Sequence, residues 1–146
     1  MFSNGGTTYL VYLIEDPKEG DGKSLTMIDS QSETVYPLAL VSFEGSTFRF
    51  GIANDEVFSG LPLYNHGLKA YRAHIVEHSE WIEELKGIHK VHPYYNEDSW
   101  RDRNHYMLLF HDEIFEVVAR GYKIEVFETT FERLSVEVVK RMNTKI

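Results

Sequence analysis

Apolar residues occupy every second position over most of the segment from His105 to Phe127. A period of two is typical of β-strands, whose successive side chains point to opposite faces of a sheet. The pattern predicts three consecutive antiparallel strands. Turns are expected at Asp112-Glu113 and at Arg120-Gly121, where glycine tolerates a positive φ angle. The positions expected on the shared core face of the three strands are Tyr106, Leu108, Phe110, Phe115, Val117, Ala119, Tyr122, Ile124 and Val126.

The two turns predict the strand register and, with it, a pair of facing carboxylates. His111 is expected opposite Ile114, and Glu116 falls opposite Glu125, where facing side chains start roughly 5 Å apart. His111 lies one pair further along the same face. Two carboxylates and an imidazole are the groups that acid/base catalysis or a divalent metal requires, so His111, Glu116 and Glu125 are a candidate metal site. The more common situation is two glutamates on an exposed face, neutralised by Lys123.

Four further strands and two amphipathic helices are predicted outside this segment. The strands are expected over residues 7–14, 35–43, 47–52 and 70–77. Ser79 is predicted to cap a helix over 79–87, and Thr129 a helix over 130–142. A polar loop over 18–23 and a short strand from 25 to 28 are also expected. These elements predict an α+β fold: one domain of residues 1–146, with a mostly antiparallel twisted sheet of about seven strands and both helices packed on one face.

Charge and composition narrow the functional classes. The 146 residues carry a net charge of −8 without a clustered basic patch, which disfavours nucleic acid and an anionic membrane surface as partners. The absence of cysteine excludes disulfides, thiolate nucleophiles and sulfur-ligated metals. No run of apolar residues has the length of a signal peptide or a membrane span. A soluble, cytoplasmic protein is therefore expected.

Candidate ligand-binding residues gather in two irregular segments and on one strand. Residues 53–67 and 88–104 are long loops rich in aromatic side chains, a type of segment that often carries function. Arg72 and His74 lie on the polar side of the strand over 70–77 and are suited to holding an anion. The residues expected to contact a ligand are Arg72, His74, His105, Tyr64, His66, Tyr94 and Trp100.

Three functional hypotheses stay open because the sequence holds no phosphate-binding glycine loop, nucleophile elbow or dinucleotide fingerprint. The leading one is a non-catalytic protein that binds a small anionic molecule or a protein partner. The second is a small metal-dependent or acid/base hydrolase centred on His111, Glu116 and Glu125. The third is an acidic inhibitor or immunity-type protein that covers a basic surface of its partner. Neither a cofactor nor the oligomeric state follows from the sequence.

Overall fold

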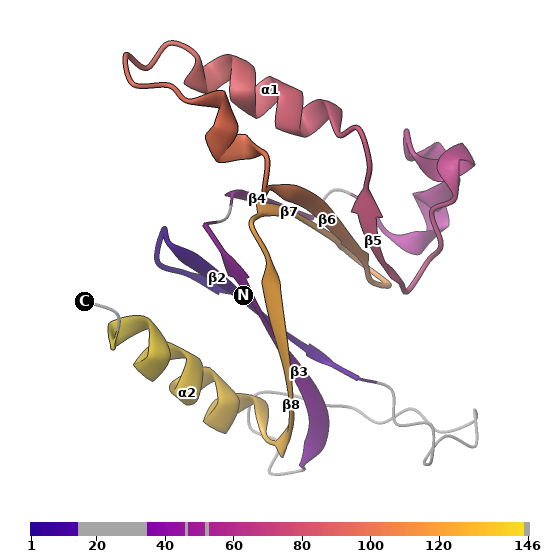
Figure 1. Ribbon diagram of the computed structural model, residues 1–146. Coiled ribbons are helices and arrows are strands. Elements are labelled where there is room, and N and C mark those ends of the chain that lie inside the picture. Colours follow the sequence, from indigo (N-terminus) through magenta and orange to yellow (C-terminus); the bar gives the residue numbers. More distant parts are fainter. Residues whose placement is uncertain (15–34, 46, 52, 145–146) are drawn as a thin grey trace. The chain divides into compact units, whose positions relative to one another are not determined.

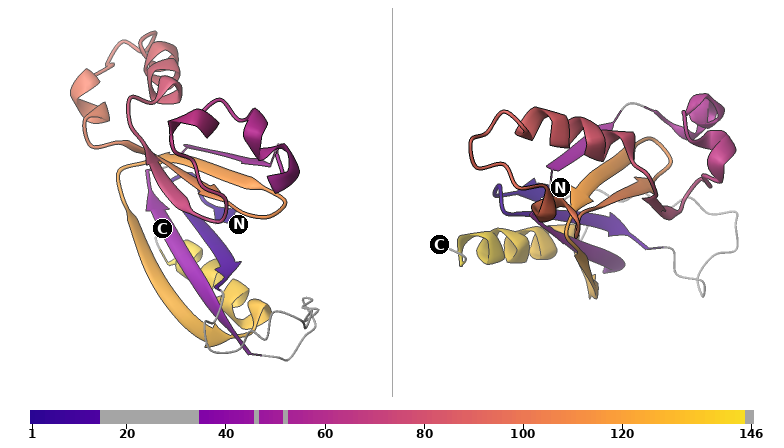
Figure 2. Two further views of the ribbon diagram at one scale, coloured as in Figure 1. Left: turned by 90° about the vertical axis from the view of Figure 1, so that its right-hand side faces the viewer. Right: turned by 45° about the horizontal axis from the view of Figure 1, so that its top comes forward.

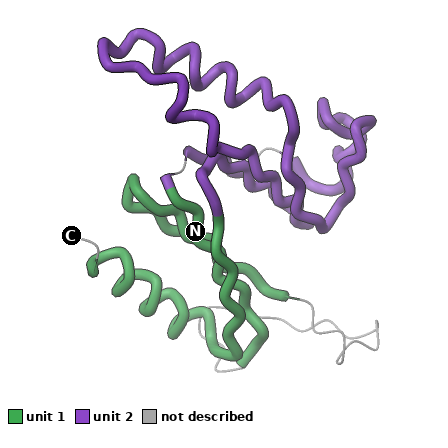
Figure 3. The backbone as a smooth tube through the Cα atoms, in the orientation of Figure 1, with its two compact units in different colours: residues 1–44, 122–146 green, residues 45–121 purple. Residues whose placement is uncertain are grey.

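A computed structural model describes residues 1–14, 35–45, 47–51 and 53–144. The predicted loop over 18–23 and the strand from 25 to 28 lie outside these residues. The described chain forms two compact units: unit 1 comprises Met1–Glu44 and Tyr122–Ile146, and unit 2 comprises Gly45–Gly121 (Figure 3). Each unit holds a four-stranded antiparallel sheet and one main helix. The predicted α+β class is confirmed, although the strands divide between two sheets; a single domain over 1–146 stays a prediction.

Unit 1 is a sheet covered on one face by a helix (Figure 1). Its strands follow the order β1-β2-β3-β8, and β3 lies between β2 and β8. Their bounds are Phe2–Ser3 for β1, Thr7–Leu13 for β2, Tyr36–Glu44 for β3 and Tyr122–Thr129 for β8, and helix α2 spans Phe131–Asn143. Alternate residues of β2 and β3 meet one stripe of α2, because the two periodicities each place their apolar side chains on a single face. The buried cluster is Tyr9, Leu38, Leu40, Leu134 and Val138.

The cap of α2 is one residue later than predicted. Thr130, not Thr129, accepts the hydrogen bond of the Arg133 N–H at 3.2 Å. Thr129 instead ends β8, where it pairs with Tyr36 of β3. Pairing with β3 therefore fixes where the strand stops and the helix begins.

Unit 2 combines its sheet with α1 and three short 3-10 helices. The strand order is β4-β7-β6-β5. The bounds are Thr47–Gly51 for β4, Ala73–Val76 for β5, Asn104–Leu109 for β6 and Ile114–Ala119 for β7. Helix α1 spans Glu80–His89, and the 3-10 helices are η1 at Asp55–Gly60, η2 at Tyr64–His66 and η3 at Glu97–Trp100. Helix α1 runs past Gly87, the predicted end, to a C-cap at Lys90.

One buried cluster of unit 2 lies where the segment with η1 and η2 packs on the sheet. It consists of Ala53, Met107, Leu109 and Ile114. Partly buried side chains of the segment and of β5 cover them: Phe58, Leu61, Leu63, Leu68 and Val76. Figure 2 gives two further views of these elements. The loop predicted over 53–67 is thus packed by its own apolar side chains.

The first predicted hairpin is present with a longer turn. Leu109, rather than His111, is the residue of β6 that faces Ile114 at the start of β7. The Phe110 N–H donates to the Glu113 carbonyl at 2.9 Å and closes a four-residue connection. Because the shift is two residues on one strand, every side chain keeps its predicted face.

The second predicted hairpin is wrong, and its core-face positions Tyr122, Ile124 and Val126 are each more than half exposed. β7 and β8 belong to different sheets, and Arg120-Gly121 connects the units instead of turning the chain back on itself. Glu116 faces Arg49 of β4, and Glu125 faces Leu40 of β3. The alternation of β8 fits any neighbour with the same pattern, and β3, apolar on both faces, provides that neighbour in unit 1.

Among the helices that the structure describes, none is long and apolar enough to cross a membrane.

Candidate functional site

A pocket of about 910 Å³ lies in unit 2 and is formed entirely by residues of that unit. The segment with η1 and η2 supplies one wall, the start of α1 supplies another, and β4, β6 and β7 supply the floor. Its apolar lining includes Leu61, Pro62, Leu63, Val76, Trp81, Met107 and Ile114. A pocket of this size matches those that take drug-sized molecules.

An ion pair between two strands crosses the floor. Arg49 of β4 lies directly opposite Glu116 of β7, and its Nε donates to Glu116 Oε2 at 2.7 Å. The guanidinium of Arg49 also lies over the Trp81 ring, 3.9 Å from its centroid. The pairing of β4 with β7 therefore places a cation and an anion together on the floor of the pocket, and the cation also contacts the indole of Trp81.

His105 is the polar group buried deepest in the pocket, with 3% of its surface exposed. Its Nδ1 lies 2.8 Å from Ser79 Oγ, which also accepts the Ile82 N–H as the cap of α1. The Ser79 hydroxyl proton needs an acceptor, and Nδ1 is the one within reach, so the ring proton belongs on Nε2. Nε2 lies 3.9 Å from Glu116 Oε2, too far for a hydrogen bond, and has no partner in the described part of the chain.

Burial, together with the nearby Arg49 charge, lowers the pKa of His105 to about 4. The imidazole is therefore neutral at pH 7, so its approach to Glu116 is not an ion pair at that pH. A base of such low basicity does little to activate the Ser79 hydroxyl, which in addition is engaged in capping α1. The arrangement of Ser79, His105 and Glu116 suits hydrogen bonding to a ligand better than proton transfer.

Of the seven predicted ligand-binding residues, the pocket brings together His66 and His105. Arg72, His74, Tyr64, Tyr94 and Trp100 do not line it. Arg72 and His74 make other contacts: the backbone carbonyl of Arg72 accepts the Leu109 N–H, and His74 Nε2 accepts the Lys69 N–H.

The three predicted aromatic contacts also lie outside the pocket. Tyr64 packs edge-on against Phe58 with 5.2 Å between ring centroids. Trp100 is buried and contacts the His89 ring and the guanidinium of Arg103. Tyr94 is 88% exposed. Trp100 therefore has a packing role, as aromatic residues commonly do.

A second polar cluster in unit 2 joins η1 to the turn between β6 and β7. Asp55 accepts the Tyr71 hydroxyl proton at 2.5 Å and lies 3.6 Å from His111 Nε2, while His111 Nδ1 lies 2.7 Å from Asp112. The hydrogen bond to Asp112, with the charges of Asp112, Asp55 and Glu56, raises the pKa of His111. These groups are largely exposed and fasten two loops together.

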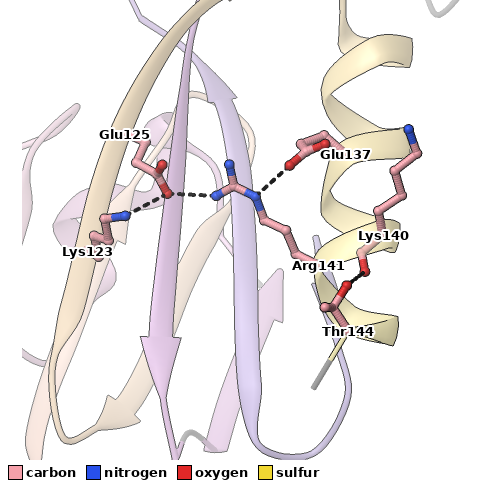
Figure 4. A network of polar contacts seen from close by, with 6 residues as sticks. All are labelled: Lys123, Glu125, Glu137, Lys140, Arg141 and Thr144. Carbon is pink, nitrogen blue, oxygen red and sulfur yellow. Dashed lines mark hydrogen bonds and ion pairs between the residues drawn. The ribbon is translucent and has the colours of Figure 1, made fainter. Parts of the chain in front are cut away.

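The strand pairing from which the metal site was predicted is not formed. Glu116 does not lie opposite Glu125 in a ladder, because each carboxylate faces another strand and pairs with its own arginine. Glu125 lies in unit 1 between Lys123 and Arg141 (Figure 4). Burial opposes ionisation of Glu125, yet the two cations lower its pKa. Within the described ranges, no group of three or more His, Asp or Glu side chains is arranged to hold a metal ion.

The sequence did not indicate the role of Arg49 and indicated only part of the role of Ser79. Ser79 was identified as a helix cap, which it is. Its position beside His105 depends on long-range pairing of β6 with β5 and β7. The loop that supplies Leu61 to His66 was detectable from its aromatic and apolar content.

No protein-family model matches the chain, and neither a curated protein nor a solved structure is significantly similar to it.

Proposed function

We propose that unit 2 is a binding module that takes a small organic molecule with an apolar body into the pocket above His105. The observation that carries this proposal is His105: it lines the pocket, is buried, and its Nε2–H group lacks a partner in the described chain. Most buried polar groups are hydrogen-bonded, and an exception in a pocket is a reason to look for a ligand.

The size and lining of the pocket support a molecule with an apolar body. Met107 and Ile114 are buried in the floor, and Leu61 and Leu63 cover them from the loop. Apolar contact with such a surface contributes about 25 cal/mol for each Å² removed from water. A ring system in this position would provide most of the affinity.

Hydrogen bonding to His105 supports a ligand that carries an acceptor oxygen. A buried donor without a partner costs about 1–3 kcal/mol, and an acceptor at the correct position removes that cost. The ligand therefore combines a ring with a hydroxyl, ether or carbonyl oxygen that reaches Nε2. The neutral imidazole provides a fixed donor at pH 7.

The anionic ligand class expected from the sequence rested on Arg72 and His74, and neither residue lines the pocket. We therefore keep the binding role, and the charge of the ligand has to be inferred from the residues that line the pocket. We also keep the cytoplasmic location expected from the cysteine-free sequence.

The test uses a naphthyl diol as probe and methionine methyl groups as reporters. In protein labelled at its methionine methyls, saturable binding should shift the Met107 signal, which reports on the pocket, and leave the Met142 signal of unit 1 in place. A His105→Phe variant keeps a ring beside Trp81 and removes the donor, so it should bind the diol about tenfold more weakly. An unchanged Met107 signal at saturating concentrations of the diol and of charged probes with the same carbon skeleton would contradict the proposal.

A further inference from the structure

Carboxylates dominate the charge of the pocket lining. Four of the lining residues are acidic, namely Glu77, Glu80, Glu84 and Glu116, and Arg49 is the one Lys or Arg among them. Arg49 is paired with Glu116, so these two charges cancel. The described part of the chain gives Glu77, Glu80 and Glu84 no ion-pair partner.

Two of the three unpaired carboxylates share one face of α1. Glu80 and Glu84 are four residues apart, a spacing that places them on the same face of the helix, and Glu77 precedes that helix. The dipole of α1 accounts for an acid in its first turn, such as Glu80, but not for Glu77 or Glu84. Glu83 differs from them because it pairs with Lys86 at 2.7 Å and does not line the pocket.

A second observation points to a ligand independently of the acidic side. His105 is 97% buried, and its Nε2 lacks a partner while it lines the same pocket. An ammonium group offers donors alone and cannot satisfy an N–H donor. A molecule that meets both features therefore needs a positive charge near α1 and an acceptor oxygen near the floor.

We infer that the ligand of unit 2 is an organic amine with an apolar ring and an oxygen acceptor, of the aryl amino alcohol or aryl amino ketone class. This inference rests on the binding role proposed above and adds the charge of the ligand. The ring occupies the apolar lining, the oxygen accepts from His105, and the ammonium group lies beside Glu80 and Glu84. An anion of the same shape meets three uncompensated carboxylates.

Three naphthyl probes with one carbon skeleton test the inference: an amino alcohol, the corresponding diol and the corresponding hydroxy acid. Each is titrated into wild-type protein with the Met107 methyl signal as readout. The amino alcohol should bind about tenfold more tightly than the diol at low salt, and the hydroxy acid should bind more weakly than the diol. The preference for the amine should shrink as sodium chloride is added, because these carboxylates are exposed.

A matched pair of variants locates the source of the preference. Glu80→Gln combined with Glu84→Gln should bring the affinity for the amine to within about threefold of the affinity for the diol. Glu83→Gln removes a charge from the same helix away from the pocket and should keep the full preference.

Two results would overturn the inference while leaving the binding role intact: equal affinity for amine and diol, or loss of the preference in Glu83→Gln. Failure of all three probes to move the Met107 signal would overturn both the inference and the binding role.

Discussion

Each unit contains a glutamate paired with an arginine, but the polar groups around the two pairs differ. In unit 1, Glu125 accepts from Arg141 at 2.8 Å and lies 3.4 Å from Lys123, while Arg141 also donates to Glu137 at 3.0 Å. In unit 2, the Arg49–Glu116 pair lies next to His105, a buried donor that no described group satisfies. A closed network of partly exposed charges is explained by the fold alone. The open one, at the floor of a pocket, is the feature on which the proposed binding role rests.

The largest expected effect comes from removing the group that holds His105. Ser79→Ala removes the cap of α1 and leaves His105 Nδ1 without its partner inside the protein. The two losses together should reduce the free energy of unfolding by about 3 kcal/mol. Urea denaturation measures the change, and Ser99→Ala is the control because the Ser99 hydroxyl is exposed and bonds to a nearby carbonyl. A loss below about 1 kcal/mol for Ser79→Ala would mean that His105 is held by other contacts.

Acidification should weaken the protein through His105. Its folded pKa, about 4, is lower than the ordinary value of 6.5, because of burial and the Arg49 charge. As the pH falls, the unfolded state binds the proton first, so stability present above about pH 6.5 is lost toward pH 4. The loss should be about 2–3 kcal/mol. A His105→Gln variant should show a correspondingly smaller change between these pH values in urea denaturation.

His111 provides the opposite case within unit 2. Its pKa is raised, first by the hydrogen bond to Asp112, so its contribution is complete below the ordinary value and is lost as the pH rises through the raised one. A His111→Gln variant should therefore retain the acid sensitivity that His105→Gln lacks. Equal pH profiles for the two variants would contradict the assignment to His105.

The smallest expected effect lies in the closed network of unit 1. Arg141→Met should reduce the free energy of unfolding by less than about 1 kcal/mol, because the pairs with Glu125 and Glu137 are partly exposed and screened by water. Thermal unfolding at low and high salt measures the change, which should nearly vanish at high salt. Arg133→Met, on an exposed position of the same helix, is the control. A loss of several kcal/mol in the free energy of unfolding that does not depend on salt would contradict this expectation.

Local pattern was sufficient to predict most elements but not their partners. The strand at 114–119 and the helix at 130–142 lie within one or two residues of β7 and α2, because alternation and helical spacing act over short range. The β7–β8 pairing failed because a short alternating strand matches several neighbours equally well. Nothing in Arg120-Gly121 distinguishes a hairpin turn from a connection between sheets.

The sequence predicted only part of the candidate site, because local features can be read from the sequence and long-range strand pairing cannot. His66 and His105 stood out by residue type and by the character of their segments. Arg49 did not, because its importance depends on β4 lying beside β7, which brings residues 67 positions apart to within a hydrogen bond. Ser79 was identified by its local role as a cap, and its bond to His105 follows only once β6 is paired with β5.

The position of β3 between β2 and β8 has a consequence for synthesis of the chain. Phe43, near the end of β3, pairs with Tyr122, the first residue of β8, so the whole of unit 2 is inserted between two neighbouring strands of unit 1. During translation unit 2 emerges as one uninterrupted stretch, whereas the edge of β3 has no β8 until the last part of the chain has left the ribosome. Domains tend to fold as they emerge, and long-range strand pairing is slow, so unit 1 is the part of the nascent chain that depends longest on protection from aggregation.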